Sequence, residues 1–213
     1  MQTFSGTEGI LIVDNLILTF QKNKQYLSDI DGLIGDGDHG INMNKGFTMA
    51  RLELDNNPGD LVHGLKILSK ILITKIGGAM GPLYGRFFNA MALSLEDKEQ
   101  IGINEVGESL KAVVKAIASV SPAKVGDKTL VDTLMPAVLA FEKARQDGNT
   151  LSEALQSLKA AAHEGYYSTK NMVAKIGRAS RLGERSIGVP DPGAASCYLI
   201  LETMSDSILK LID

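Results

Sequence analysis

The chain has 213 residues, of which 44% are hydrophobic and 22% are charged, and these proportions are ordinary for a soluble globular protein. The formal net charge of -3 argues against a nucleic-acid-binding surface, which is normally basic. The single cysteine, Cys197, excludes an internal disulfide, and no apolar run approaches the length of a membrane span. We therefore expect a cytoplasmic protein with no nucleic-acid and no membrane partner.

Apolar residues recur at helical spacing along nearly the whole chain. In one segment Leu61, Leu65, Leu68 and Leu72 step by four, three and four residues, which predicts one buried helix face. Strand-like alternation and hairpin dipeptides are not evident. Short connections should make neighbouring helices antiparallel. We predict a single all-α domain over residues 1–213 with eight helices: 6–26, 41–56, from 61, from 82, 106–120, 128–145, from a cap at Ser152, and 194–211.

The most informative stretch is residues 31–44, where three aspartates and four glycines fall within the first ten positions. Carboxylates so close together repel one another, and a hard divalent cation such as Mg²⁺ would reconcile them through its preference for oxygen ligands. Glycines let the backbone turn sharply and bring its N–H groups near an anion. The helix expected to start near Gly40 would direct its positive N-terminus to the same place. The stretch therefore suggests a metal site that also binds phosphate.

Two other interpretations of this stretch fit less well, and a third stays open. Residues 35–40 match the dinucleotide pattern G-x-G-x-x-G, but that pattern is informative only after a β-strand, and no βαβ unit is evident. A calcium EF-hand needs a carboxylate at position twelve of its loop, and the three registers place Gly40, Asn42 or Phe47 there. A solvated acidic loop in which Asp38 or Asn42 merely caps a helix stays open as an alternative.

Two further loops interrupt the helical pattern and contain groups that could approach a ligand. Residues 77–81 hold three glycines, and the bare backbone around Gly78 would let a phosphate or nucleotide come close. A plain turn between helices is the alternative. Residues 121–129 include Asp127, which could cap a helix, and Thr129, which could reach a ligand.

The longest expected loop, residues 177–193, joins the last two helices. Loops of this length in compact domains commonly act as lids or ligand-binding loops. It carries Arg178, Arg181 and Arg185, whose planar guanidinium groups suit bidentate contacts with phosphate. It ends in a rigid Asp-Pro-Gly turn at residues 191–193 that could fix a sugar or base. A surface loop with solvated charges is the alternative from composition alone.

Taken together, these loops resemble the L subunit of dihydroxyacetone kinases, which also occurs as the nucleotide domain of single-chain ATP-dependent dihydroxyacetone kinases. Five motifs carry the resemblance, in the same order and with compatible spacing. They are GDGDHGINMN at residues 35–44, GGAMGPL at 77–83, GDKT at 126–129, GRAS at 177–180, and LGERSIG at 182–188 followed by DPG at 191–193. The acidic motif and the GERSIG run are specific, whereas the glycine turn alone is not.

The resemblance implies an eight-helix antiparallel barrel or bundle with a nucleotide pocket at one end. It implies that Asp31, Asp36 and Asp38 bind two Mg²⁺ ions, which hold the phosphates of ADP or ATP. The positions that match nucleotide-contacting residues of the family, or lie in its matching loops, are His39, Gly40, Ile41, Asn42, Gly78, Ala79, Met80, Ser121, Thr129, Leu130, Arg178, Asp191, Pro192 and Gly193.

Phosphoryl transfer needs little covalent chemistry from a protein, because positioning and charge neutralisation carry it. We expect Arg178 to add a rigid cation as charge develops on the transferring group, and we assign His39, within the acidic motif, to catalysis with it. The resemblance places the substrate, dihydroxyacetone, on a separate K subunit and is compatible with a homodimer. The phosphotransferase-system branch is favoured because this chain carries no substrate domain. In that branch ADP stays bound and is rephosphorylated by a phosphohistidine protein, the M subunit.

Three other functions fit the same residues. They are an ATP-dependent kinase subunit for another short ketose or tetrose, a non-catalytic partner that reports nucleotide state to a transcription regulator, and a stand-alone metal phosphohydrolase. One departure from the family bears on these alternatives. The glycine turn often carries a serine where this chain has Met80, so a hydroxyl that would contribute about 1 kcal/mol through a hydrogen bond to phosphate is absent.

Overall fold

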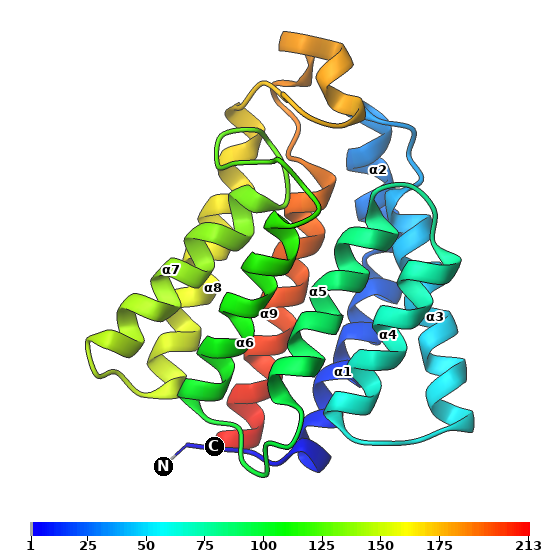
Figure 1. Ribbon diagram of the computed structural model, residues 1–213. Helices are drawn as coiled ribbons and strands as arrows, with labels where there is room; N and C mark the ends of the chain where they lie inside the picture. The colour runs from blue at the N-terminus through cyan, green and yellow to red at the C-terminus, as the bar shows by residue number, and fades with distance from the viewer. Residues whose placement is uncertain (1) are drawn as a thin grey trace.

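The computed structural model describes residues 2–213, and within that range it contains nine α-helices and two 3₁₀ segments. In chain order these are α1 (Gly6–Lys22), α2 (Lys24–Ile34), α3 (His39–Asn56), α4 (Leu61–Lys75), α5 (Met80–Leu95), α6 (Ile103–Ala118), α7 (Val131–Gln146), α8 (Leu151–Ser168), η1 (Thr169–Asn171), η2 (Arg178–Ser186) and α9 (Pro192–Ile212). The long helices alternate in direction, with both chain ends at one end of the bundle and η2 at the other (Figure 1). The predicted all-α antiparallel bundle is confirmed.

The helix count differs from the prediction because the expected first helix is interrupted. Asn23 ends α1, and both its backbone N–H and its side-chain amide donate to the carbonyl of Thr19. A separate helix, α2, then continues to Ile34, because Leu27, Ile30 and Ile34 recur at helical spacing and are buried. Asp31, which the sequence placed in a loop, therefore lies in the last turn of a helix.

Several predicted helix starts differ from those observed by two or three residues, and two of them have a clear local cause. Thr150 rather than Ser152 caps α8, because the Thr150 hydroxyl accepts the N–H of Glu153 while the Glu153 carboxylate accepts the N–H of Thr150. The helix expected from residue 128 begins only at Val131. The Asp127 carboxylate caps no helix there and accepts the N–H of Lys124, which closes a tight turn before α7.

One continuous hydrophobic core runs through the helices from α1 to α9. The four leucines predicted to share one face of α4 are all buried. Near them the rings of Phe20 and Phe47 stack with centroids 4.2 Å apart, and Phe88 packs edge-on against Phe47. Within residues 2–213, no helix combines the length and hydropathy that crossing a membrane requires.

Candidate metal and nucleotide site

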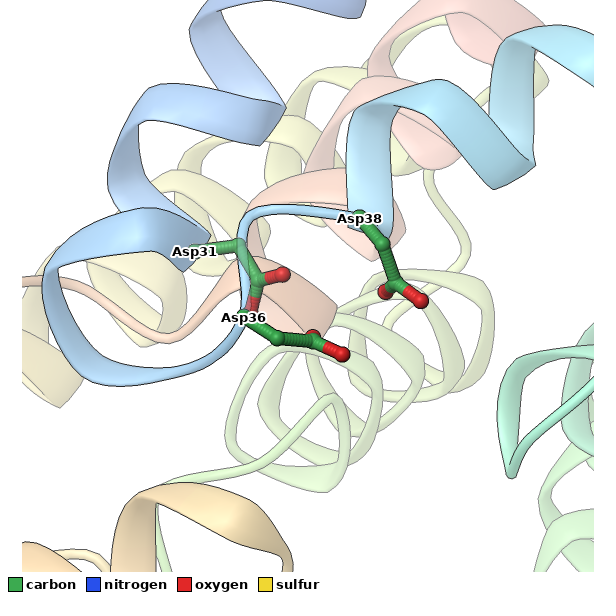
Figure 2. Close-up of side chains that lie close together, drawn as sticks. All are labelled: Asp31, Asp36 and Asp38. Carbon is green, nitrogen blue, oxygen red and sulfur yellow. The ribbon is translucent and has the colours of Figure 1, made fainter.

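Asp31, Asp36 and Asp38 converge where α2 passes into α3, at the end of the bundle that carries η2 (Figure 2). One carboxylate oxygen from each lies within 4.8 Å of those of the other two. Asp31 projects from the last turn of α2, Asp36 from the short connection, and Asp38 from the residue before α3. The structure therefore brings together the three residues predicted from the sequence, on one side of one turn.

Steric constraints explain why glycine occupies three positions around this turn. A Cβ at Gly35 would lie 2.3 Å from Oδ1 of Asp31, so any side chain there would displace the carboxylate. Gly37 has φ +75°, a conformation that glycine adopts at little cost. A Cβ at Gly40 would lie 2.0 Å from the backbone oxygen of Lys24, which shows how closely α3 begins against α2. These residues let the two helix ends meet and bring the aspartates together.

The carboxylate set fits a hard divalent cation. Mg²⁺ binds oxygens at about 2.1 Å, so two of its ligands lie at most about 4.2 Å apart, and the upper limit of 4.8 Å on the spacing of these oxygens is compatible with that after a small adjustment. The backbone N–H of His39 donates to Oδ2 of Asp31 at 3.1 Å and fixes that carboxylate in place. Asp36 is exposed, and Asp31 and Asp38 are half-buried, which leaves room for water or phosphate oxygens to complete a coordination shell.

Arg178, the first residue of η2, forms an ion pair with Asp36 and so links the long loop to the acidic turn. Both side chains are about half exposed, at 58% and 46%. A guanidinium in this position balances part of the negative charge of the turn, and it can reach an anionic ligand there. The loop expected to be irregular is thus partly ordered as 3₁₀ turns, interrupted at Gly183, whose φ is +54°.

His39 does not face the carboxylates but points into the protein. Its side chain is 7% exposed, and Nε2 lies 2.9 Å from the hydroxyl of Ser196, which in turn lies 2.5 Å from the hydroxyl of Tyr84. Tyr84 also donates to the carbonyl of Gly193 at 3.0 Å. Burial lowers the pKa of His39 to about 4, so the ring is neutral at pH 7. The ring therefore links the start of α3 to α5 and α9, and its assignment to catalysis stays a prediction.

Tyr84 and Ser196 were not singled out from the sequence. Both occupy ordinary positions on helices that are 112 residues apart in the chain, and their only common signal is a polar side chain inside an apolar pattern. Such a signal does not say which partner a residue will meet.

The start of α9 brings several predicted nucleotide-contacting residues together. The Asp191 carboxylate caps the helix by accepting the N–H of Ala194 at 2.8 Å, and Pro192 is buried in the first turn. An added Cβ at Gly193 would lie 3.6 Å from the backbone nitrogen of Leu130, so these two predicted residues are neighbours. Burial raises the pKa of Asp191 to about 7, although nearby backbone N–H groups and the charge of Lys128 oppose the shift.

The glycine turn before α5 presents bare backbone. Gly77, Gly78 and Ala79 are exposed, Gly78 has φ +69°, and no atom lies within 4 Å of a Cβ placed on Gly77 or Gly78. Met80 opens α5 and packs partly against the core. The backbone of this turn is therefore free to approach a bulky anion, and the nucleotide contact expected for residues 77–81 stays a prediction.

The remaining predicted contact residues have varied surroundings. Gly40, Ile41 and Asn42 form the first turn of α3, where Gly40 is buried and Ile41 is 51% exposed. The hydroxyls of Ser121 and Thr129 accept backbone N–H groups two residues further along the chain, at 3.3 and 3.2 Å, so both are already used in local turns.

A separate open cleft of about 610 Å³ lies at the opposite end of the bundle, between the start of α4 and the end of α5. Its lining mixes both signs of charge, including an ion pair of Lys66 with Glu96 at 2.5 Å. It contains none of the residues predicted to bind metal or nucleotide, so we attach no ligand to it.

The model of the DAK2 domain matches residues 33–206. The chain belongs to the DAK2 domain family. Among its relatives, it is 34% identical over 205 residues to "PEP-dependent dihydroxyacetone kinase 2, ADP-binding subunit DhaL" of Listeria innocua, covering 94% of each chain. It is 41% identical over 191 residues to "PTS-dependent dihydroxyacetone kinase, ADP-binding subunit DhaL" of Lactococcus lactis, covering 88% of this chain and 90% of the relative.

Solved structures support the same fold for this DAK2 domain. The dihydroxyacetone kinase of C. freundii in its native form superposes with a TM-score of 0.71 at 22% identity, over 97% of this chain. The structure of that kinase with AMP-PNP and Mg²⁺ gives a TM-score of 0.65 over 92% of this chain, also at 22% identity. This chain spans about a third of that kinase, 36% and 33% in the two comparisons. The likeness establishes the helical bundle.

Proposed function

We propose that the chain, acting as a single domain over residues 1–213, is the nucleotide-binding subunit of a dihydroxyacetone kinase. It transfers a phosphoryl group from a Mg²⁺-bound nucleotide to dihydroxyacetone held on a separate K subunit. The bound ADP is then rephosphorylated by a phosphohistidine M subunit of the phosphotransferase system. The names of the two bacterial relatives, which are ADP-binding subunits of PEP- and PTS-dependent kinases, support this branch over the ATP-dependent one.

The observation that carries the proposal is the convergence of Asp31, Asp36 and Asp38 within 4.8 Å of one another. Three carboxylates held this close by a glycine turn are unfavourable unless cations balance them, and Mg²⁺ is the cation that accompanies nucleotide phosphates. Arg178 already reaches this cluster from η2. The C. freundii kinase, which shares this fold, has a solved complex with AMP-PNP and Mg²⁺, and this further supports a Mg²⁺-bound nucleotide as the ligand.

The chemistry assigned to the chain is positioning and charge neutralisation. The aspartates would hold the metal, which when bound shields the phosphate charge and polarises the transferring group. The backbone N–H groups of residues 77–79 and the N-terminus of α9 would receive the phosphate tail and the rest of the nucleotide. Arg178 would stabilise the charge that develops on the transferring phosphoryl group. No residue of this chain becomes phosphorylated in this scheme, because the phosphoryl group passes between the nucleotide and the partner proteins.

The test combines identification of the bound nucleotide with reconstitution. Protein purified without added nucleotide is denatured, and the released small molecules are identified by mass spectrometry, with ADP as the expected result. The chain is then mixed with a purified K subunit, dihydroxyacetone and Mg²⁺, with either phosphorylated M subunit or ATP. We expect dihydroxyacetone phosphate to accumulate over many turnovers when phosphorylated M subunit is in excess. With ATP alone we expect at most about one turnover, because the bound ADP carries no transferable phosphoryl group and is not exchanged.

Asp36→Asn should abolish transfer, whereas Asp29→Asn should not. Asp29 lies on α2, as Asp31 does, but outside the cluster, and it accepts a hydrogen bond from Gln25. Multiple turnover on ATP alone would replace the proposal with the ATP-dependent branch. Hydrolysis of ATP by this chain without partners would indicate a phosphohydrolase. Absence of transfer with a K subunit that is active with another L subunit would indicate a non-catalytic binding role.

A further inference from the structure

A buried ammonium group contacts both ends of the segment between α8 and α9, which carries Arg178. Lys128 is 1% exposed and lies in the turn before α7, well away in sequence from that segment. Its Nζ donates to three backbone carbonyls, those of Met172 at 3.2 Å, Ser186 at 2.6 Å and Val189 at 2.6 Å. An ammonium has three protons, so all its donors are used on this one segment.

The three acceptors lie at both ends of the arginine-bearing stretch. Met172 follows η1 and precedes Arg178 by six residues, whereas Ser186 ends η2 and Val189 leads into the start of α9. By binding all three, Lys128 ties the two ends of the segment together, beside a direct bond from the N–H of Gly188 to the carbonyl of Lys170 at 2.8 Å. Neighbouring bonds support the same arrangement, because the hydroxyl of Ser186 accepts the N–H of Ala174 at 2.9 Å.

Packing alone does not account for Lys128. Burying a cation is costly unless it is paired or fully hydrogen-bonded, and an apolar residue would fill the same space at lower cost. The negative charge of Asp191 acts on this ammonium from a distance, but among the described residues no carboxylate lies within 4.0 Å of it, so backbone carbonyls supply its direct contacts. The buried charge is therefore used to gather backbone oxygens, much as a bound monovalent cation would be.

The backbone conformation of the turn that carries Lys128 directs its side chain toward the three carbonyls. The residue has φ +63°, a left-handed conformation that costs a non-glycine residue about 1 kcal/mol. The fully buried Asp132 holds this conformation by accepting the N–H groups of Gly126 at 2.5 Å and Thr129 at 2.7 Å. The left-handed backbone of Lys128 and its three carbonyl acceptors are therefore two independent features that fix the position of its amino group.

We infer that Lys128 is a positioning residue that acts as a built-in cation: it fixes the segment of residues 172–189 so that Arg178 reaches the aspartate cluster. The inference rests on the proposed function for its catalytic consequence, but its structural part does not. The residue contacts neither the aspartates nor the arginine. Removing its charge is therefore expected to loosen the arginine-bearing segment while leaving Asp31, Asp36 and Asp38 in place.

The experiment compares Lys128→Met, which keeps the length of the chain but loses the ammonium, with Lys124→Met, which removes an exposed lysine from the same turn. The first readout is limited digestion with trypsin, because Arg178, Arg181 and Arg185 offer cleavage sites within the segment. We expect Lys128→Met to be cleaved there at least about tenfold faster, since cleavage tracks the population of the open segment. Far-ultraviolet circular dichroism should still report an intact bundle.

A second readout separates positioning from binding. In the reconstituted transfer reaction, Lys128→Met should lower kcat by about a hundredfold while the affinity for Mg²⁺ changes less than about threefold. In Lys128→Ala, n-propylammonium should restore much of the slow cleavage and of kcat, because it replaces the missing part of the side chain. Propanol, which lacks the charge, should not.

Equal cleavage of Lys128→Met and Lys124→Met would overturn the inference, and so would rescue by propanol as well as by n-propylammonium. If both Lys128 variants lose the whole bundle, Lys128 is a general core residue and the inference is wrong. If the wild-type chain transfers no phosphate but the cleavage and rescue results hold, the proposed function fails and the positioning role of Lys128 stands.

Discussion

Gly40→Ala tests the claim that close contact between two helices assembles the aspartate cluster. A Cβ at this position would lie 2.0 Å from the backbone oxygen of Lys24 and 2.8 Å from the backbone nitrogen of Ser28. Both are backbone atoms within α2, so no side chain can move aside to relieve the contact. The start of α3 must instead retreat from α2 by about 1 Å, because interiors are packed too densely to absorb the overlap.

The expected cost follows from this geometry. Overpacking in a well-packed core commonly costs 1–3 kcal/mol, and a clash with backbone on two sides belongs at the upper end, so we expect a loss of about 3 kcal/mol in the free energy of unfolding. Asp31 is on α2 and Asp38 precedes α3, so separating the helices also spreads the carboxylates. Urea unfolding followed by circular dichroism measures the first effect, and calorimetric titration with Mg²⁺ measures the second.

Gly32→Ala is the matched control. This glycine also lies in α2, but an added Cβ would be 3.8 Å from the Cα of Gly37, which is an ordinary contact. Alanine is favoured over glycine in a helix by up to about 1 kcal/mol, so this variant should be as stable as the wild type or more so. Equal stability and equal Mg²⁺ affinity of the Gly40 and Gly32 variants would show that the contact between α2 and α3 does not hold the cluster together.

Three further predictions concern the same end of the bundle. Mg²⁺ at about a hundred times its dissociation constant should raise the free energy of unfolding by about 2.7 kcal/mol, and Asp38→Asn should remove most of that gain in thermal unfolding curves. Met80→Ser should tighten ADP binding about fivefold in calorimetry by restoring a hydroxyl to the glycine turn, and unchanged or weaker binding would contradict this. Because burial raises the pKa of Asp191 to about 7, the folded state holds this proton more tightly than the unfolded one. The contribution of Asp191 should therefore be most favourable below about pH 4 and be lost as pH rises through 7, by up to a few kcal/mol. Asp191→Asn keeps a capping oxygen without the ionisation, so urea midpoints measured across this range should favour the variant progressively more as pH rises; a constant difference would refute the assignment.

The parts of the molecule that the sequence predicts well are those encoded locally. Helix faces follow from the spacing of apolar residues, as the buried leucine stripe of α4 illustrates. Asp31, Asp36 and Asp38 fall within eight consecutive residues, so a single turn can bring them together and the metal hypothesis needs no knowledge of the tertiary fold. The pattern does not predict the break at Asn23, because the apolar periodicity of α1 runs on into that of α2 and the boundary depends on a cap.

The parts that were missed depend on contacts between distant segments. His39 was placed with the carboxylates because it follows Asp38, but its side chain turns inward to Ser196 on α9. Whether a helix residue faces the site or the core depends on the neighbour that covers it, and the local sequence does not contain that neighbour. The role of Lys128 is not predictable from the sequence for the same reason, since all three of its acceptors are backbone carbonyls more than forty residues away.

The site therefore has two halves, one formed by local sequence and one by contacts between distant segments, and mutation should be able to impair them separately. The carboxylate half is built by one turn whose glycines permit it, so a substitution there should weaken metal binding first. The cationic half comes from the segment of residues 172–189, which is anchored at both ends, so a substitution in its anchors should spare metal binding and impair transfer. Asp36 and Arg178 are the pair in which the halves meet. Loss of metal affinity and loss of transfer should therefore be separable by mutation. If every substitution in either half reduced both together, the two halves would form one cooperative site and this division would be wrong.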